Sequence, residues 1–376
     1  MFPPFPQEKA FAECKVMLAE LRDKSLVIEK TTAAESERVC QGVMLGALVC
    51  RSEGGEEVFL RCLSGTTRIL KAKQDSPGRI YVPPIAGADA IAMALTKNDA
   101  EIHSLTAAIN ALRQGRQGEP SAEEKALVSR RCSLTTESLQ KVHELYAFHC
   151  ADGSLRSLQD ICRERLGGAL PPTGTGDCCA PKLLDYAFSH GLQPLSLCEI
   201  FYYIAPADAE PQPMPPCDER CGIILPAMLG IEILYCDKDI IVVNKQSGLL
   251  SVPGRGPDKQ DCIVNRVKRL FPDCITQPAV HRLDMETSGL LVLAFTKEAH
   301  RELCRQFAAG EVSKEYVALL DGVLAKKGIA PHGQMELYFR LDVENRPHQI
   351  WDEVYGKKAV TEWQILGVER YHAPDG

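Results

Sequence analysis

The 376-residue sequence lacks several features that would point directly to a class of protein. It has no apolar run long enough to span a bilayer, and its first residues lack the basic segment and apolar core of a signal peptide. It has no excess of basic residues either, because the formal net charge is -7 and the pI is near 5.8. The overall charge therefore gives no sign of nucleic-acid binding, and any such surface would have to be a local basic patch.

Cysteine, in contrast, is abundant, with 16 residues. In a chain without a signal peptide these thiols are expected to be mostly reduced, in the cytoplasm. Four of them, Cys178, Cys179, Cys217 and Cys221, could gather around zinc, but neither pair has the two-residue spacing of a zinc knuckle. Unrelated free thiols are the favoured interpretation. A structural zinc site is the alternative, and metal analysis would test it.

Residues 1–204 predict an accessory α/β region. Gly42 to Cys50 and Val58 to Leu63 predict a β-hairpin. Apolar residues at helical spacing on both sides of a Gly-Pro break at 114–120 predict two antiparallel helices, the second reaching about Phe148. The glycine-rich loop at 167–181 lacks the lysine spacing of a Walker motif, which favours a simple turn over a phosphate site.

The next stretch, 205–229, predicts a linker, because clustered prolines at 205–218 exclude a regular element there. Residues 230–376 then predict a second domain in which hairpin-connected strands and helices alternate. Its expected strands are Ile231–Tyr235, Ile240–Asn244, Gly289–Phe295, Tyr316–Leu320, Met335–Phe339 and Ala359–Leu366. One helix is expected near Asp261–Phe271, and another after an N-cap at Thr296. This pattern predicts an α+β fold with a mixed, largely antiparallel sheet.

Residues 281–289, His-Arg-Leu-Asp-Met-Glu-Thr-Ser-Gly, place one carboxylate between an arginine and a polar turn, immediately before a predicted strand. An acid held at the edge of a sheet by a tight loop is a candidate catalytic group. The alternative is that Asp284 caps its own turn by accepting hydrogen bonds from nearby backbone amides.

The second domain resembles the RluA-type pseudouridine synthases, which isomerise uridine within RNA. The resemblance covers about residues 230–370 and rests on five motifs in order, at 243–254, 281–289, 314–318, 345–349 and 356–363. It implies a stem-loop of ribosomal or transfer RNA as the partner. It also implies a reaction without redox change or phosphate cleavage, for which no metal or nucleotide cofactor is needed.

By this resemblance Asp284 is the essential acid, acting as a nucleophile or as a base. Tyr316 would stack on uracil and accept the proton that leaves C5. A base inside folded RNA must be extruded, and Arg282 would then fill the vacated stack or hold a phosphate; its alternative is a salt bridge with a neighbouring acid. The residues expected at the RNA surface are Arg282, His281, Lys245, Arg255 and Thr287.

The family also has a later Thr-Gly-Arg motif, whose arginine pairs with the catalytic aspartate, and this sequence ends where that motif should begin. We therefore expect a truncated chain that is inactive or feeble on RNA and prone to aggregation. Two other classes stay open. One is a non-catalytic RNA-binding protein that keeps the scaffold, and the other is a hydrolase that uses Asp284 together with Glu286.

Overall fold

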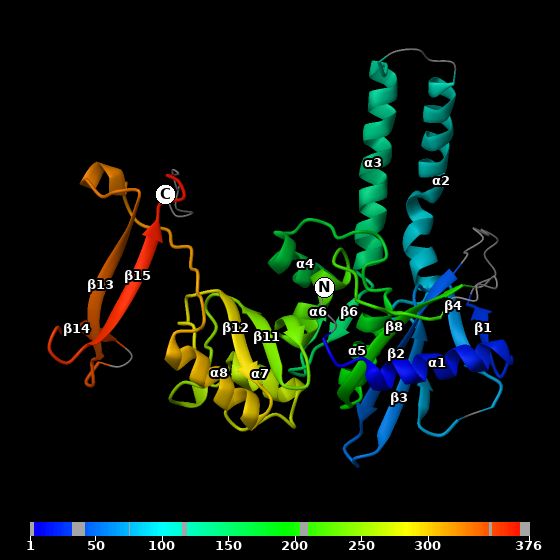
Figure 1. Cartoon of the computed structure of the whole chain (residues 1–376). Coiled ribbons are helices and arrows are strands. Elements are labelled where there is room, and N and C mark those ends of the chain that lie inside the picture. Colours follow the sequence, from blue (N-terminus) through cyan, green and yellow to red (C-terminus); the bar gives the residue numbers. More distant parts are fainter. Residues whose placement is uncertain are drawn as a thin grey trace. The chain divides into compact units, whose positions relative to one another are not determined.

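A computed structural model describes residues 4–31, 42–74, 76–114, 119–203, 210–345 and 348–368. The contacts divide the chain into two compact units, Met1–Val312 and Ser313–Gly376, and each is described by itself. Figure 1 labels the elements. None of the helices in the described ranges combines the length and the apolar character of a membrane span.

The first part of the larger unit is built around a five-stranded sheet with the order β5-β3-β2-β8-β9. Its pairs are antiparallel except β3 with β5. The predicted hairpin is confirmed, since β2 and β3 pair with Cys50 opposite Val58. The strands are β2 (Gly42–Arg51), β3 (Glu57–Leu63), β5 (Arg79–Tyr81), β8 (Gln193–Tyr203) and β9 (Pro213–Met214).

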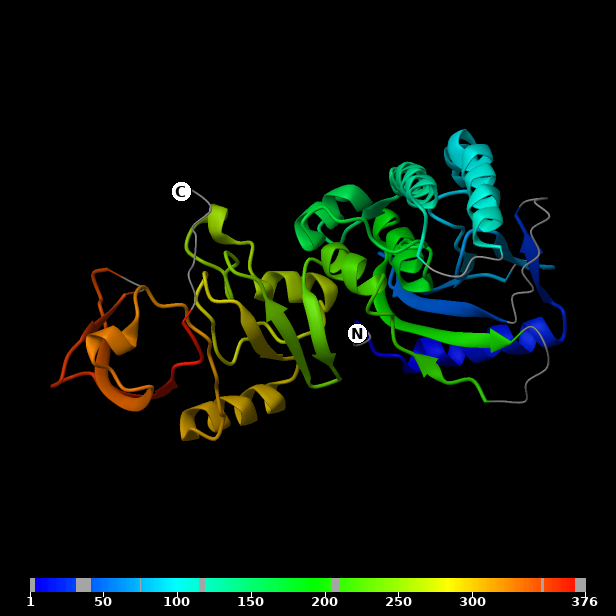
Figure 2. The same ribbon diagram turned by 90° about the horizontal axis from the view of Figure 1, so that it is seen from above.

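Strand β2 is central and is buried on both faces, because successive side chains of a strand point to opposite sides of its sheet. Leu45, Ala47 and Val49 pack against helix α1 (Glu8–Arg22) and the small ladder of β1 (Leu26–Lys30) with β4 (Arg68–Ala72). Leu48 and Cys50 face α5 (Cys179–Ser189). Figure 2 shows α1 (dark blue) on one side of these strands and green helices on the other.

The predicted helical hairpin is confirmed as α2 (Ala88–Arg113) and α3 (Ala122–His143), which lie side by side in Figure 1. Ser121 caps α3, with its Oγ accepting from the Glu124 amide at 3.1 Å. The second helix is shorter than predicted. After His143 the chain forms β6 (Ala147–His149), which pairs with β7 (Leu155–Ser157) and leads into α4 (Leu158–Leu166).

The predicted linker at 205–229 is wrong for its last nine residues, which form helix α6 (Cys221–Leu229). Eight of these nine residues are buried, because the sequence is apolar around the whole helix and must be covered on every side. The expectation of no regular element at 205–218 is also wrong at β9. This short strand pairs with β8 and lies at the edge of the sheet, where a proline is tolerated. Residues 205–209 lie outside the described ranges.

A second sheet follows α6 and has the antiparallel order β10-β11-β12. The predicted hairpin, strand and helices are confirmed, and Thr296 caps α8 by accepting from the Ala299 amide at 3.2 Å. The elements are β10 (Glu232–Cys236), β11 (Ile240–Lys245), η1 (Pro257–Lys259), α7 (Ile263–Leu270), β12 (Gly289–Ala294) and α8 (Lys297–Ala309). One hydrophobic core runs from Leu48 through Met228 to Leu293, so it crosses the predicted domain boundary.

The smaller unit is a three-stranded antiparallel sheet with the order β14-β13-β15, preceded by the turn η2 (Leu324–Lys327). Its strands are β13 (His332–Leu341), β14 (Gln349–Trp351) and β15 (Lys357–Gln364), which confirms the strands predicted at 335–339 and 359–366. The strand predicted at Tyr316–Leu320 is wrong. That segment has no strand partner among the described residues, and Tyr316 and Val317 are 63% and 87% exposed. The α+β class is confirmed.

Two leucines of β12 test which face of this strand is buried. Leu293→Ala should lower the free energy of unfolding by about 2–5 kcal/mol, because Leu293 is fully buried and its removal leaves a cavity. Leu290→Ala, at a position that is 65% exposed, is the matched control and should change it by less than about 0.5 kcal/mol. Urea unfolding measures both, and equal losses would contradict the assigned faces.

Candidate active site

The loop at 281–289 presents Asp284 to solvent. Its backbone makes a turn in which the Thr287 amide donates to the Asp284 carbonyl at 3.1 Å, and β12 begins two residues later. The Asp284 side chain is exposed, and its carboxylate accepts no hydrogen bond from any described residue. The turn-capping alternative is therefore not what the structure contains, and both oxygens are available for chemistry.

Lys245, the last residue of β11, lies beneath this loop with its side chain fully buried. Its Nζ donates to the carbonyls of Leu249, Met285 and Gln246 at 2.6, 2.8 and 3.0 Å. Burial lowers the pKa of the ammonium, and the carboxylates of Glu286 and Asp284 act in the opposite direction. Lys245 therefore holds the loop in position from beneath, and its predicted contact with RNA stays a prediction.

A second set of contacts holds the backbone on both sides of Asp284. The Ser251 hydroxyl donates to the Leu283 carbonyl at 2.6 Å and accepts from the Leu283 amide at 3.0 Å. The Gly248 amide donates to the Met285 carbonyl at 2.9 Å, at a residue whose φ of +80° favours glycine. The segment 245–251 is thus a wall that fixes the backbone on both sides of Asp284.

The other predicted RNA contacts divide into two kinds. His281 is half-buried: its Nε2 accepts from the Val292 amide at 3.1 Å, and its ring stacks on Phe307 at 4.7 Å. It therefore supports the start of the loop. Arg282 and Arg255 are exposed, and neither guanidinium has a hydrogen bond or ion pair with a described residue. The salt-bridge alternative for Arg282 is not observed.

Tyr316 belongs to the smaller unit, where its ring is exposed. Asp284 lies in the larger unit, and the role of Tyr316 at the uracil stays a prediction.

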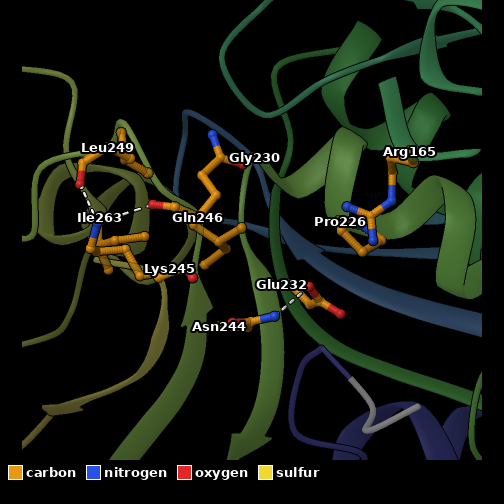
Figure 3. Close-up of a pocket in the computed structure, with 11 residues that line it drawn as sticks. Arg165, Pro226, Gly230, Glu232, Asn244, Lys245, Gln246, Leu249 and Ile263 are labelled. Carbon is orange, nitrogen blue, oxygen red and sulfur yellow. Dashed lines mark hydrogen bonds between the residues drawn. The ribbon is translucent and has the colours of Figure 1, made fainter. Parts of the chain in front are cut away.

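A hollow of about 200 Å³ lies beside the loop, and Ser288 is part of its wall. Gln246 and Arg165 also line it (Figure 3). On another part of this wall the Asn244 amide donates to Glu232 at 3.1 Å. Arg165 comes from α4 in the accessory region, a contribution that the sequence analysis missed. Nothing in the sequence pairs Arg165 with Gln246, which lies 81 positions further along, because only the tertiary fold brings them together.

A neighbouring hollow of about 400 Å³ continues along α4 and α7, and its wall also includes Arg165 and Gln246. Its lining carries both signs of charge. Arg266 binds both oxygens of Asp261 at 2.7 and 2.6 Å, and Arg156 pairs with Glu164. Of the basic residues between Lys245 and Arg282, Lys245 is buried and Arg266 is neutralised, whereas Arg255 and Lys259 are exposed.

Part of this chain is similar to known proteins. Residues 239–371 match the family model described as RNA pseudouridylate synthase. This segment is similar to the RluA-type pseudouridine synthases. It contains both Asp284 and Tyr316.

Two relatives show the extent of the match to this synthase family. The dual-specificity RNA pseudouridine synthase RluA of Yersinia pestis is 48% identical over 134 residues, which are 36% of this chain and 62% of the relative. Its namesake from Haemophilus influenzae is 47% identical over 136 residues, 36% of this chain and 59% of the relative. The chain thus spans about three fifths of these relatives.

Among solved structures, human RNA pseudouridylate synthase domain containing 1 is 26% identical. The match covers 35% of this chain and 50% of the human chain, with a TM-score of 0.27.

The contacts of Lys245 generate a test. Lys245→Met keeps most of the length of the side chain but removes the donor that bonds three carbonyls, of which only that of Met285 keeps a bond from a described residue, through the Gly248 amide. The free energy of unfolding should therefore fall by about 2–3 kcal/mol. Lys238→Met, at an exposed position in the β10–β11 turn, is the control and should change it by less than about 0.5 kcal/mol. Urea unfolding of both variants gives the comparison, and a Lys245→Met protein as stable as the control would refute the positioning role.

Proposed function

We propose that this chain isomerises uridine to pseudouridine in structured RNA, with Asp284 as the essential acid. The observation that carries the proposal is an exposed carboxylate, free of hydrogen bonds to described residues, in a loop whose backbone is fixed on both sides. A catalytic group is most effective when it is held in place before the substrate arrives. The match of residues 239–371 to the synthase family supports the same assignment.

The chemistry agrees with such a group. The N1–C1′ bond of uridine breaks, the uracil turns, and a bond from C5 to C1′ replaces it. C5 loses its proton to a base and N1 takes up a proton, so the product is an isomer. All other atoms stay in the nucleoside. Asp284 either attacks the sugar and forms a covalent intermediate, or removes a proton from it. Tyr316, in the same family segment, is proposed to stack on the uracil and to take the C5 proton.

The RNA itself is part of the proposal. The relatives carry the name dual-specificity RNA pseudouridine synthase, and we propose a stem-loop of ribosomal or transfer RNA for this chain. The target base must leave its stack to reach Asp284. Arg282 lies two residues away with an exposed, unpaired guanidinium, which suits the vacated stack or a flanking phosphate.

We also propose that the chain acts in the cytoplasm. Every cysteine that the structure describes is free of a disulfide, as expected where thiols stay reduced. Cell fractionation tests this, and recovery from an oxidising compartment would contradict it.

Asp284→Asn should abolish pseudouridine formation, a loss of at least about a thousandfold, because an amide is neither a nucleophile nor a base. Stability should be unchanged, since the carboxylate makes no hydrogen bond to a described residue. Glu286→Gln removes a carboxylate from the same loop and should retain activity, which separates synthase from hydrolase chemistry. Mass spectrometry of nucleosides from treated transfer and ribosomal RNA measures the product. RNA binding without product from the unaltered chain would favour the non-catalytic alternative.

Arg282→Ala should weaken RNA binding and make it less sensitive to salt. If Arg282 contacts one phosphate, the slope of log affinity against log salt should fall by about one unit. Arg301→Ala, on the exposed face of α8, is a matched loss of charge that should leave the slope unchanged. Filter binding at several salt concentrations measures both variants, and identical slopes for Arg282→Ala and the unaltered chain would rule out the phosphate contact.

A further inference from the structure

Three cysteines that are distant in the sequence meet beside the accessory sheet. Cys178 is the N-cap of α5, Cys221 is the first residue of α6, and Cys217 precedes α6 by one turn. Their sulfur atoms all lie within 4.8 Å of one another, and the Cys178 and Cys217 sulfurs are 4.0 Å apart. The expectation of unrelated thiols is therefore wrong for these three.

This spacing is close to that of a metal site. In a tetrahedral zinc site with Zn–S bonds of about 2.3 Å, the sulfurs lie roughly 3.8 Å apart. Small side-chain rotations would bring the three sulfurs to that separation. A disulfide between Cys178 and Cys217 would instead require the two sulfurs to close to about half their present distance, and it would leave Cys221 without a role.

The surroundings favour thiolates and a cation. The N-termini of α5 and α6 both point their partial positive charge at the sulfurs. Arg220 is the N-cap of α6, and its buried Nε has no hydrogen-bond partner among the described residues. A buried carboxylate is also close, since Glu199 accepts from the Ala180 amide at 2.6 Å. A divalent cation would balance this group of potential negative charges.

We propose that Cys178, Cys217 and Cys221 bind one zinc ion. Binding releases the thiol protons, forms three Zn–S bonds, and leaves the fourth corner of the tetrahedron to water. Cys179 is not a ligand, because its sulfur is fully buried and donates to the Met44 carbonyl at 3.5 Å. Three soft sulfur ligands select zinc over the hard cations magnesium and calcium.

The role of the site is structural. Cys178 is fixed to the accessory sheet through α5, whereas Cys221 begins α6, which leads through Gly230 into β10. A zinc ion would therefore tie the entry of the pseudouridine synthase segment to the accessory sheet. None of its ligands contacts the loop at 281–289, so this inference does not depend on the proposed catalysis.

Metal analysis of the purified full chain tests the proposal. We expect about one zinc ion per chain, loss of the metal in Cys217→Ser and in Cys221→Ser, and full retention in the control Cys304→Ser on α8. The proposal is overturned by three results: no zinc in the reduced chain after dialysis against zinc sulfate, zinc that persists in both ligand variants, or a Cys178–Cys217 disulfide in the freshly isolated protein.

Cobalt gives a second readout that does not require activity. Replacement of zinc by Co²⁺ should produce the visible bands of a tetrahedral site together with thiolate charge-transfer absorption. Cys304→Ser should keep both, and Cys217→Ser should lose both. An octahedral cobalt spectrum in the folded, unaltered chain would contradict a thiolate site. Pseudouridine formation by a zinc-free variant at low temperature would leave the catalytic proposal intact, so the two proposals fail separately.

Discussion

The buried ammonium of Lys245 is the contact on which the candidate active site depends. Two chain segments, 245–249 and 283–287, turn their carbonyl oxygens toward the same point, and such dipoles repel one another unless a donor lies between them. Lysine meets this need with three donors on one nitrogen. Because these bonds hold the backbone and not the carboxylate, Asp284 remains exposed while its position is fixed, which is the combination that a preorganised catalytic group requires.

Helix α6 explains why the accessory region is not a passive attachment. An apolar helix must be covered on all sides, and α6 packs against α4 and α5 as well as against the strand β10 that follows it. The accessory sheet and the synthase segment consequently share one core. The same packing places Arg165 beside Gln246 at the edge of the site. If residues 1–229 were removed, the apolar side chains of the synthase segment that α6 covers would be exposed to water.

The sequence predicted the elements that depend on short-range patterns, and it failed where distant residues decide. The hairpins, the helix pair and the Thr296 cap follow from neighbouring residues alone. The burial of Lys245 could not be predicted, because it depends on a carbonyl forty positions away. At 205–229 the proline cluster dominated the interpretation, although the apolar run after Cys221 was the stronger signal. At Tyr316 the sequence favours a strand, but no strand forms, because strand propensity takes effect only where a neighbouring strand is present to pair with.

The cysteines show the same limit and also indicate why a metal is useful where they meet. Apolar burial fixes the middle and the end of α6, but Cys217, one turn before it, is exposed. The stretch before that residue is rich in proline and polar groups and has little apolar surface to bury. Its ordering therefore cannot be driven by the hydrophobic effect. Metal–thiolate bonds are strong and need no apolar area, so zinc can hold the turn before α6, which the core does not reach.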